Sequence, residues 1–389
     1  MQIAECSMWA ALLALALCAV STEAREISVP KHHATIQAAI DAAADDDTII
    51  VAEGTYTEKL KIAGKKLTLA STDYFRNADD WRVVEKTILD GGPDGKKKGA
   101  PIVEVKQGAE LKLIGFTIQN SHHAVVVSGR IDASHNRFVE NGDALSFEDG
   151  RGHVSQNIFE NNSDDGIDMD GSSAAVIERN VIRNNKDDGI EIRLHKYRGP
   201  PLEIVIRNNT FQGNREDGLQ LIDYPGMSDR TFRIERNLFA DNAMAAIGTM
   251  ADGNTKENYE GADMLEPVAI VNNTLVGNRY GITGGDNMLL LNNVIAQTAQ
   301  SALKRVHGDS AAGVNLLWKN GEDLDNCDLS GEAFVAADPK LDAHYKPMAG
   351  SPCIDAGAAR FKYNGEEFVV PEDSYTGNAP DLGAFEFKR

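Results

Sequence analysis

Positive charge is scarce in this sequence of 389 residues: 39 Lys and Arg stand against 59 Asp and Glu, and the formal net charge is −20. Proteins bind nucleic acids through clusters of Lys and Arg that contact phosphates, so this balance argues against a nucleic-acid partner. An acidic surface instead favours neutral partners, cations, or anionic ligands that are reached through a bound divalent metal ion.

Cysteine is also scarce, and several cofactor motifs are missing. Of the four cysteines, only Cys327 and Cys353 lie beyond the N-terminal region. In an exported protein these two could form one disulfide or remain free thiols. The sequence has no Walker loop, Rossmann glycine fingerprint, His-Glu-x-x-His or Cys-x-x-Cys, so neither a nucleotide cofactor nor structural zinc is implied.

The apolar run near the N-terminus is short. It extends over 12 residues from Trp9 to Val20, too few to span a bilayer but suited to a secretory signal, and Ala24 offers a cleavage site. The residues before it include Glu5 and no Lys or Arg, which is atypical and leaves a buried helix as the alternative. We expect residues 1–24 to be a signal peptide of a secreted or periplasmic protein without a membrane span.

A short phrase recurs through the middle of the chain. It reads Asn-x-apolar-x-x-Asn, followed in the best copies by acidic-Gly-apolar-polar-apolar residues. The copies begin at Asn136, Asn157, Asn180, Asn209, Asn237, Asn273 and Asn293, so their starts are 21, 23, 29, 28, 36 and 20 residues apart. A base period near 21 with local insertions predicts the coils of a solenoid with loops on one side.

Apolar residues alternate within each copy, as at Ile167 and Met169, which indicates strands with Gly and Asn at the corners. Asn residues at one corner can stack into a hydrogen-bonded ladder along the axis. At the N-terminal end, residues 35–43 have helical spacing and suit a helix that caps the first coil. The last residues match no repeat, so we expect a tail over the other end.

The segment TIQAAIDAAADDDTIIVAEGTYTEKLKI from Thr35, the Asn-rich coils and the SPCIDAG…DLGAFE ending resemble the right-handed parallel β-helix superfamily of pectate-lyase-like proteins. The resemblance implies an all-β, single-stranded right-handed parallel β-helix over residues 25–310, including the cap helix, and an irregular C-terminal capping region over 311–389. It implies little about function, because members include lyases, hydrolases, esterases, epimerases and proteins of no known activity.

Stacking the four best copies in register places acidic residues in columns outside the strands. The columns are Asp143, Asp165, Asp188 and Asp217; Ser146, Asp168, Glu191 and Gln220; and Glu148, Asp170, Arg193 and Ile222. Equivalent residues in adjacent coils lie about 4.8 Å apart, so these carboxylates repel unless they share protons, bind a cation or pair with Arg. We assign the first column to Ca²⁺, which prefers several oxygen ligands; turn formation by Asp-Gly is the alternative.

Two further features are expected to shape the site. A column of small residues, Ala144, Gly166, Gly189 and Gly218, is assigned to the outside, where it would leave room for a ligand. The insertions at 194–201, 223–230 and 251–267 are expected to form one wall of a groove. Their tyrosines, Tyr197, Tyr224 and Tyr259, with Arg198 and Asp170, are our candidates for binding sugar, although an exposed tyrosine in a loop is ordinary.

Catalysis is assigned to Asp168, Glu191, Arg193, His195 and Lys196. Abstracting the proton next to a uronate carboxylate needs a base, for which Arg193, His195 and Lys196 are candidates, and a cation such as Ca²⁺. The resemblance implies this arrangement for members that cleave acidic polysaccharides by elimination. The same basic residues could merely neutralise the acids.

Two alternatives remain. Hydrolysis could use Asp168 with Glu191 or Asp170, because the strand geometry gives spacings near those of retaining and inverting glycosidases. The segment SDDGIDMDG from Ser163 is similar to that of polygalacturonase-like hydrolases, but their Gly-His-Gly is missing. The other alternative is a non-catalytic carbohydrate-binding or surface protein. The leading hypothesis is a monomeric lyase or epimerase of an acidic polysaccharide, assisted by Ca²⁺.

Overall fold

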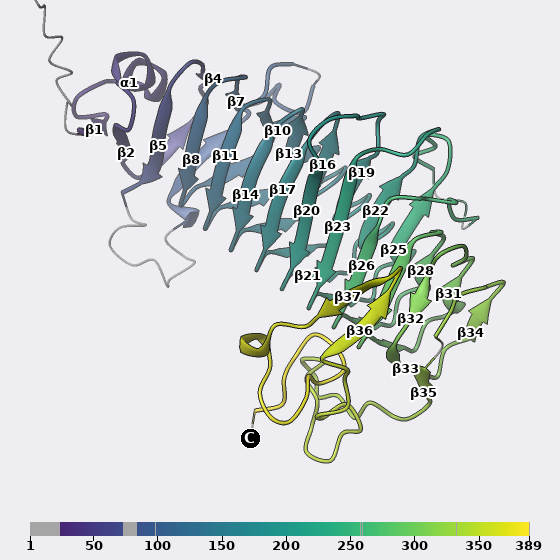
Figure 1. Ribbon diagram of the computed structural model, residues 1–389. Helices are drawn as coiled ribbons and strands as arrows, with labels where there is room; N and C mark the ends of the chain where they lie inside the picture. The colour runs from purple at the N-terminus through teal and green to yellow at the C-terminus, as the bar shows by residue number, and fades with distance from the viewer. Residues whose placement is uncertain are drawn as a thin grey trace, which may run out of the picture.

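The computed structural model describes residues 24–72, 84–97, 99–256, 258, 260–331 and 333–388. The chain winds into a right-handed parallel β-helix with three long parallel sheets of 12, 11 and 12 strands (Figure 1). This confirms the fold class expected from the sequence. The predicted signal peptide lies almost entirely outside the described residues. Within the described residues, no helix is long and apolar enough to cross a membrane.

Each coil contributes one strand to each sheet. We call the three sheets the first, second and third sheet. The first consists of β1 (Glu26–Val29), β2 (Thr48–Val51), β5 (Lys66–Ser71), β8 (Glu110–Ile114), β11 (Arg130–Ser134), β14 (Arg151–Ser155), β17 (Ala174–Glu178), β20 (Leu202–Arg207), β23 (Arg230–Glu235), β26 (Val268–Val271), β29 (Met288–Leu291) and β32 (Ala311–Ala312). The second consists of β4 (Leu60–Ile62), β7 (Val103–Val105), β10 (His123–Val127), β13 (Asp143–Glu148), β16 (Ile167–Asp170), β19 (Ile190–Arg193), β22 (Leu219–Ile222), β25 (Ala245–Met250), β28 (Tyr280–Thr283), β31 (Ser301–Lys304) and β34 (Glu322–Asp325). The third consists of β3 (Gly54–Tyr56), β6 (Thr87–Asp90), β9 (Thr117–Gln119), β12 (Arg137–Val139), β15 (Ile158–Glu160), β18 (Val181–Arg183), β21 (Thr210–Gln212), β24 (Leu238–Ala240), β27 (Thr274–Val276), β30 (Val294–Ala296), β33 (Val314–Trp318) and β35 (Ala333–Val335).

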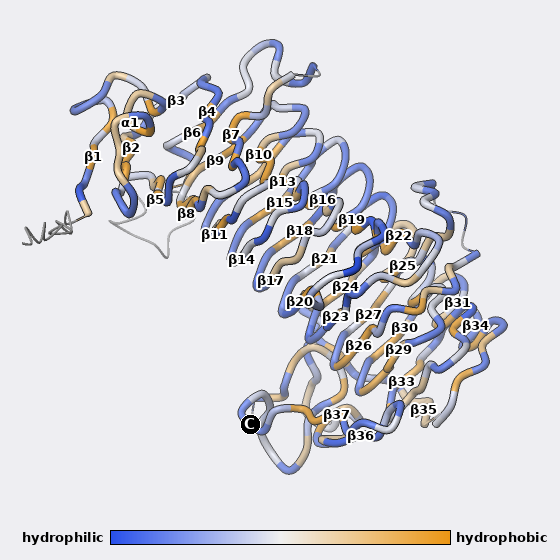
Figure 2. Tube along the Cα trace, turned by 45° about the horizontal axis from the view of Figure 1, so that its top comes forward, coloured by the Kyte–Doolittle hydropathy of each residue, from blue (hydrophilic) through white to orange (hydrophobic). Residues whose placement is uncertain are grey.

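The interior is filled by stacked apolar side chains. The rings of Phe138 and Phe159 stack at 4.6 Å between centroids, and those of Phe211 and Phe239 at 4.5 Å. A short strand cannot bury its apolar face alone, so each coil depends on its neighbours for its core. Polar residues recur at the same corners of successive coils (Figure 2), which keeps the interior apolar.

Two asparagine ladders line the corners beside the third sheet, which confirms the expected ladder. The members of the ladders are Asn136, Asn157, Asn180, Asn209, Asn237, Asn273, Asn293 and Asn315, and Asn141, Asn162, Asn185, Asn214, Asn242 and Asn278. The amide oxygen of every Asn after the first in each ladder accepts hydrogen bonds from the backbone N–H and the side-chain amide of the preceding Asn, as Asn185 does from Asn162. These bonds satisfy polar groups that the close-packed coils remove from water.

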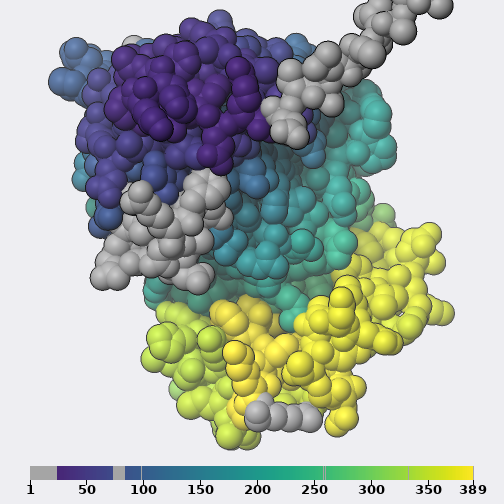
Figure 3. Space-filling view, turned by 90° about the vertical axis from the view of Figure 1, so that its left-hand side faces the viewer, coloured from purple at the N-terminus to yellow at the C-terminus, as the bar shows by residue number. Residues whose placement is uncertain are grey.

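The N-terminal end is closed by the predicted helix, α1 (Ile36–Ala42). The side chain of Thr35 accepts a hydrogen bond from the Ala38 backbone N–H, and Ile36 and Ile40 are buried in the core. Their spacing of four residues places both on one face of the helix. Figure 3 shows the purple N-terminal residues gathered over this end of the stack.

The C-terminal segment differs from the expectation in two ways. The coils continue to β35, past residue 310, and the remaining chain lies along the side of the last coils (Figure 1). Its antiparallel hairpin, β36 (Arg360–Tyr363) and β37 (Glu366–Val369), and Val370 pack against Val271, Leu289 and Leu291 of the first sheet. These sheet residues form an apolar patch on the outside of the coils, and the C-terminal segment shields this patch from water. Cys327 and Cys353 are free thiols.

Candidate functional site

The acidic columns predicted from the repeat are present on the second sheet. In the parallel register of β13, β16, β19 and β22, one residue of each strand lies next to its counterpart in the following strand. These residues are, in order, Ser146, Asp168, Glu191 and Gln220. Their neighbours in sequence, such as Ile167 and Ile190, face the core and are fully buried. The sequence therefore assigned the register of these four coils correctly. We call the group Asp165, Asp168, Asp170, Glu191 and Arg193 the acidic strip.

The first column forms a ladder of its own. Oδ1 of Asp143, Asp165, Asp188 and Asp217 accepts the backbone N–H of Asp165, Asp188, Asp217 and Ala245, at 3.4, 2.9, 2.6 and 2.5 Å. One oxygen of each carboxylate thus accepts a backbone hydrogen bond at the turn. This agrees with the alternative interpretation, in which Asp-Gly forms the turn into the strand. Asp143, Asp164 and Asp165 each place a carboxylate oxygen within 4.8 Å of the other two. Asp165, Asp187 and Asp188 form a second group with the same spacing.

The column of small residues was assigned to the wrong side. A Cβ on Gly166 would lie 2.9 Å from Cγ2 of Ile182, and one on Gly218 would lie 2.6 Å from Cδ1 of Phe239. These positions face the interior, where stacked apolar side chains occupy the space. The glycines therefore make room for the core, and they leave no opening for a ligand.

Asp165, Asp168 and Glu191 form the centre of the acidic strip. They offer carboxylate oxygens within 4.8 Å of one another, and their exposed fractions are only 5%, 6% and 4%. The sequence led us to expect an exposed ribbon, and in this respect the structure differs. Burial, followed by the charge of Asp170, raises the pKa of Asp168 to about 7.

The other two carboxylates are shifted in the same direction. Burial raises the pKa of Glu191 to about 8; Arg193 opposes this shift and Asp168 adds to it. Burial and the charge of Glu191 raise the pKa of Asp165 well above its ordinary value. Three buried carboxylates at this separation repel one another strongly when ionised. The cluster therefore favours a proton or a cation.

Arg193 lies across the strip. Its Nη1 is 3.3 Å from Oδ1 of Asp168 and 3.1 Å from Oδ2 of Asp170, and its Nη2 forms an ion pair with Glu191. Burial lowers the pKa of Arg193, but Glu191, Asp168 and Asp170 together raise it above its ordinary value. Arg193 is thus held as a cation, which fits the neutralising role and argues against a role as base.

His195 and Tyr224 lie at the edge of the strip. The Gly171 backbone N–H donates a hydrogen bond to Nδ1 of His195 at 3.2 Å, and Oδ1 of Asp170 lies 3.7 Å from the same nitrogen. The rings of His195 and Tyr224 are 4.5 Å apart between centroids. Because Nδ1 accepts the Gly171 N–H, the ring proton belongs on Nε2 in this arrangement. Lys196 is exposed beside His195.

Tyr197 and Arg198 are engaged within their own loop region. The Tyr197 hydroxyl donates to the Pro200 carbonyl at 3.0 Å, and its ring packs against the core and beneath the Arg230 guanidinium. Arg198 forms an ion pair with Asp229 at 2.9 Å. Tyr259 lies outside the described residues.

The insertions do lie side by side. The Asp229 backbone N–H donates to the Tyr197 carbonyl, which joins the first two loops. Oγ of Ser228 donates to Oε1 of Glu266 at 2.7 Å, which joins the second and third. The three loops therefore form one continuous border along the second sheet.

Several acidic and polar residues next to the acidic strip were not among the predicted site residues. Asp164, Asp187 and Glu216 precede the first column as doubled acids, a signal visible in the sequence; burial and Glu216 raise the pKa of Asp187 to about 7. His123, which we did not include in the site, has Nδ1 2.9 Å from Oδ2 of Asp143, and this hydrogen bond raises its pKa.

Gln220 was aligned with the second column but given no role. Its side chain is fully buried, and within the described part of the chain neither its amide oxygen nor its amide nitrogen has a hydrogen-bond partner. Such groups are rare because an unsatisfied buried amide costs about 1–3 kcal/mol. Its place next to Glu191 in the column brings an unused amide oxygen to the end of the carboxylate cluster.

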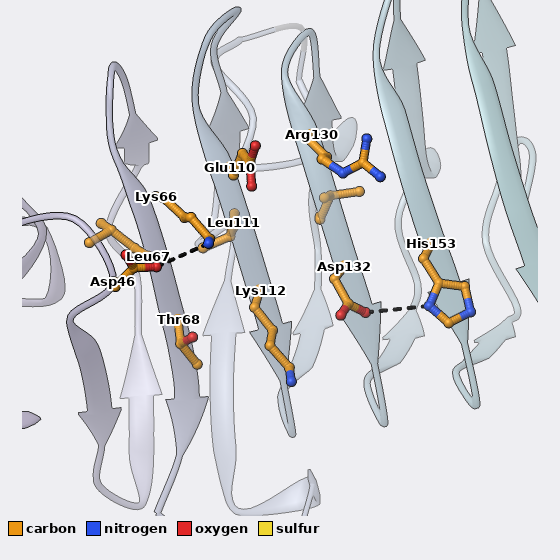
Figure 4. A pocket seen from close by; sticks show the side chains of 11 residues that line it. Asp46, Lys66, Leu67, Thr68, Glu110, Leu111, Lys112, Arg130, Asp132 and His153 are labelled. Carbon is orange, nitrogen blue, oxygen red and sulfur yellow. Dashed lines mark ion pairs between the residues drawn. The ribbon is translucent and has the colours of Figure 1, made fainter. Parts of the chain in front are cut away.

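A separate cavity lies on the first sheet, away from the strip (Figure 4). Its volume is about 290 Å³, and its lining residues come from β5, β8, β11, β14 and the turn at Asp46. Charges alternate across it: Lys66 pairs with Asp46 at 3.1 Å, and His153 lies 3.8 Å from Asp132. Figure 4 shows these side chains spread over a sheet face, which is typical of a solvated surface.

The fold and the acidic strip define a right-handed β-helix protein. The family model described as "Right handed beta helix region" matches residues 101–295, half of the chain. The chain belongs to this family. No sequence among the curated proteins matches it.

Solved structures to which this chain is similar include a pectate lyase, a protein in complex with xylose and an alginate epimerase. The pectate lyase Pel9A has a TM-score of 0.62 and 16% identity, over 94% of this chain and 96% of that one. XylC, solved in complex with xylose, has a TM-score of 0.52 and 11% identity, over 79% and 84%. A point mutant of the periplasmic alginate epimerase AlgG has a TM-score of 0.47 and 15% identity, over 75% and 72%. At these identities the likeness shows the fold alone.

Proposed function

We propose that this protein acts on an acidic, uronate-containing polysaccharide at the acidic strip, by β-elimination or epimerisation, with the assistance of Ca²⁺. The observation that carries the proposal is the buried cluster of Asp165, Asp168 and Glu191, whose oxygens lie within 4.8 Å of one another. Arg193 is the cation paired with this cluster, and one positive charge is fewer than three carboxylates require.

The residues present suit Ca²⁺, which takes six to eight oxygen ligands. Asp165, Asp168 and Glu191 would hold the ion, and the unpartnered amide oxygen of Gln220 is the next donor in the column. Asp165 also gives one oxygen to the turn ladder, but its carboxylate is grouped with those of Asp168 and Glu191; Asp143, Asp188 and Asp217 lie outside that group, so we assign them a supporting role. When bound, Ca²⁺ would stabilise the negative charge that develops on the uronate carboxylate.

Lys196 is our candidate for the base. Arg193 is held as a cation by three carboxylates, and Nδ1 of His195 already accepts a hydrogen bond from Gly171. Lys196 is exposed one residue further along the loop that borders the strip. His195, with its proton on Nε2, is suited to donating a hydrogen bond to the substrate, and Tyr224 beside it offers a ring face for a sugar.

The proposed chemistry begins when the Lys196 amine takes the C5 proton of a uronate residue. In elimination, the C5–H electron pair forms the C4–C5 double bond, the bond to the glycosidic oxygen at C4 breaks, and that oxygen takes a proton from water; the resulting hydroxide takes the proton held by Lys196. In epimerisation, water on the opposite face gives a proton to C5, the resulting hydroxide takes the proton held by Lys196, and no bond to oxygen breaks. General base catalysis of this kind typically contributes about 10²–10⁴-fold.

Hydrolysis by Asp168 with Glu191 or Asp170 is the alternative chemistry. It is supported less well, because Asp168 and Glu191 have raised pKa values of about 7 and 8, while a retaining mechanism needs one ionised nucleophile. A non-catalytic carbohydrate-binding protein is the third possibility, with the acids serving only the turns and a structural ion.

One experiment separates the three. The protein is incubated with polygalacturonate, alginate and other polyuronates, with Ca²⁺ or with EGTA. A lyase yields ultraviolet-absorbing unsaturated ends, an epimerase changes the C5 configuration by NMR, and a hydrolase yields reducing ends without absorbance. Glu191→Gln should abolish Ca²⁺-dependent turnover, and Asp132→Asn, on the first sheet, should leave it unchanged. Absence of turnover on every substrate would reject the enzyme proposal.

Export is part of the proposal, because such polymers are extracellular or periplasmic substrates. It is supported by the apolar run from Trp9 to Val20 and the small residue Ala24. N-terminal sequencing of the mature protein tests it: a start at Arg25 supports cleavage after Ala24, and retention of Met1 or Gln2 contradicts it.

A further inference from the structure

The start of the first strand lies against a buried carboxylate. Ala24 is exposed, and Arg25 comes directly before β1. Asp47 comes directly before β2, and its side chain is only 2% exposed. Because β1 and β2 pair in parallel at the end of the first sheet, the residues that precede them lie side by side (Figure 1). The peptide bond between Ala24 and Arg25 is the one that the proposed removal of the signal peptide would break.

The two oxygens of the Asp47 carboxylate have different partners. Oδ1 accepts a hydrogen bond from the Arg25 backbone N–H at 2.8 Å. Oδ2 accepts hydrogen bonds from the Arg25 guanidinium, with Nη2 at 2.6 Å and Nε at 3.2 Å, and from the Ala44 backbone N–H at 2.9 Å. The partner of Oδ1 is therefore the nitrogen that cleavage after Ala24 would turn into the α-amino group of the mature chain.

Asp47 carries its negative charge inside the fold. The hydrogen bond from the Arg25 side chain lowers the pKa of Asp47 to about 2, against the effect of burial and with help from the Arg25 and Ala44 backbone N–H groups. Hydrogen bonds between two charged groups are roughly twice as strong as those between neutral groups. An ammonium in place of the Arg25 amide would supply such a bond at Oδ1.

The surroundings of Asp47 favour a further positive charge. Asp45 and Asp46 precede it in the turn before β2. Lys66 pairs with Asp46 at 3.1 Å, and Nζ of Lys65 donates to carbonyl oxygens at the end of α1 at 2.9 and 2.8 Å. Within the described parts of the chain, Asp45 forms no ion pair. A cation at the start of β1 is therefore attracted by more than one carboxylate.

We propose that removal of the signal peptide completes the N-terminal cap, because the α-ammonium of Arg25 that is released by cleavage after Ala24 binds Oδ1 of Asp47. The inference rests on the export that is part of the proposed function. A peptidase of the export machinery would hydrolyse the bond: water gives its hydroxyl to the Ala24 carbonyl carbon and its proton to the Arg25 nitrogen. The new carboxyl group then passes its own proton to the amine, which leaves a carboxylate on Ala24 and an ammonium on Arg25.

The pairing would strengthen the point where the cap meets the coils. Asp47 also accepts the N–H of Ala44, in the turn from α1 to β2, and the Thr48 N–H donates to the Arg25 carbonyl at 2.9 Å. One carboxylate thus joins the helix, β1 and β2. In a solenoid each coil contacts only its neighbours, so the ends depend on their caps for stability. The protein should therefore be most stable after it has been processed.

The test compares the melting temperature at pH 7 of two forms of the protein. One begins at Arg25, and the other retains Ala24, so that the Arg25 nitrogen remains an amide. We expect the form that begins at Arg25 to melt at least about 2 °C higher. The same pair of forms carrying Asp47→Asn completes a double-mutant cycle, and there the difference should disappear. Asp46→Asn is the matched control, because it removes an adjacent, exposed carboxylate and should keep the difference.

Two further measurements make the result specific. Acetylation of the α-amino group restores an amide at the Arg25 nitrogen without any change at Asp47, and it should lower the melting temperature to that of the longer form. Arg25→Gln removes the guanidinium but keeps the α-amino group, so the difference between the two forms should persist. Equal melting temperatures with Asp47 present, or a difference that persists in Asp47→Asn, would overturn the pairing.

Failure of this inference can be told apart from failure of the proposed function. N-terminal sequencing that places the start of the mature protein away from Arg25 would overturn the inference through the cleavage site. Polyuronate turnover should be equal in the two forms, because the acidic strip lies on the second sheet. Absence of turnover in both forms would reject the enzyme proposal, and a higher melting temperature of the form that begins at Arg25 would still support the pairing.

Discussion

Asp168 and Glu191 lie opposite each other on the neighbouring strands β16 and β19, and both contact the same guanidinium, that of Arg193. Residues from different coils are thus brought into one buried electrostatic unit by the register of a solenoid. Burial destabilises the ionised form of both carboxyls and thereby raises the pKa of each. Clusters of strongly shifted titratable groups are more common at functional sites than elsewhere.

Neutralising Glu191 should stabilise the protein while removing the proposed activity. Glu191→Gln keeps the size of the side chain and eliminates repulsion with Asp165 and Asp168, so we expect a gain on the order of 1–3 kcal/mol in the free energy of unfolding at pH 8 without divalent ions. Urea denaturation measures this gain. Glu235→Gln, which removes an ion pair with Arg233, should give no gain. A loss of stability in Glu191→Gln would contradict the proposed repulsion.

The stability of the metal-free protein should fall as pH rises from about 4 to 8. The folded state keeps protons on Asp168, Asp187 and Glu191 up to pKa values of about 7, 7 and 8, whereas the unfolded chain loses them near the ordinary values of 3.8 and 4.5. Because the folded state binds more protons in this window, each excess proton contributes a slope of up to about −1.4 kcal/mol per pH unit. Denaturation at several pH values in EGTA measures the slope, which should be shallower in Glu191→Gln.

The register of the acidic strip could be predicted from the sequence because a period near 21 leaves one alignment in which Ile167, Ile190 and Leu219 all face the core. The Asn ladders follow from the same period. The direction of Gly166 and Gly189 was predicted wrongly, because β16 and β19 begin only at Ile167 and Ile190, so these glycines lie before the strands and strand alternation does not apply to them. That Arg193 would lie over Asp168 and Glu191 depends on a side-chain conformation, which no repeat pattern specifies. The tail's position depends on the apolar patch around Leu289 and Leu291, far from it in sequence.

Ca²⁺ should raise the melting temperature, and chelation should reverse the effect. An ion that binds only the folded state adds about 2.7 kcal/mol when its concentration is about 100 times its dissociation constant. Scanning calorimetry with increasing Ca²⁺ measures the shift. Asp165→Asn with Glu191→Gln removes two proposed ligands and should abolish the shift, whereas Asp132→Asn should retain it. The same shift in both variants would place the ion elsewhere.

Lys196→Met should reduce kcat by about 10²–10⁴-fold and change KM little, because the side chain is proposed to take a proton in the reaction and to contribute little to binding. His195→Gln retains a hydrogen-bond donor and should lose less. Steady-state kinetics by ultraviolet absorbance on polygalacturonate measures both. Full activity in Lys196→Met would move the base to another residue.

Gly189→Ala tests why the small-residue column exists. An added Cβ would lie 2.4 Å from the Gly218 carbonyl oxygen and 2.9 Å from Cδ1 of Phe211, so the substitution must push apart two coils or displace an interior ring. Overpacking of this kind costs about 1–3 kcal/mol, and we expect a lower free energy of unfolding by that amount. Gly99→Ala is the control, because its nearest neighbour, the Lys97 carbonyl oxygen, is 3.7 Å from the added atom. If Gly189 instead admitted a ligand, the substitution would weaken oligosaccharide binding and leave urea denaturation unchanged.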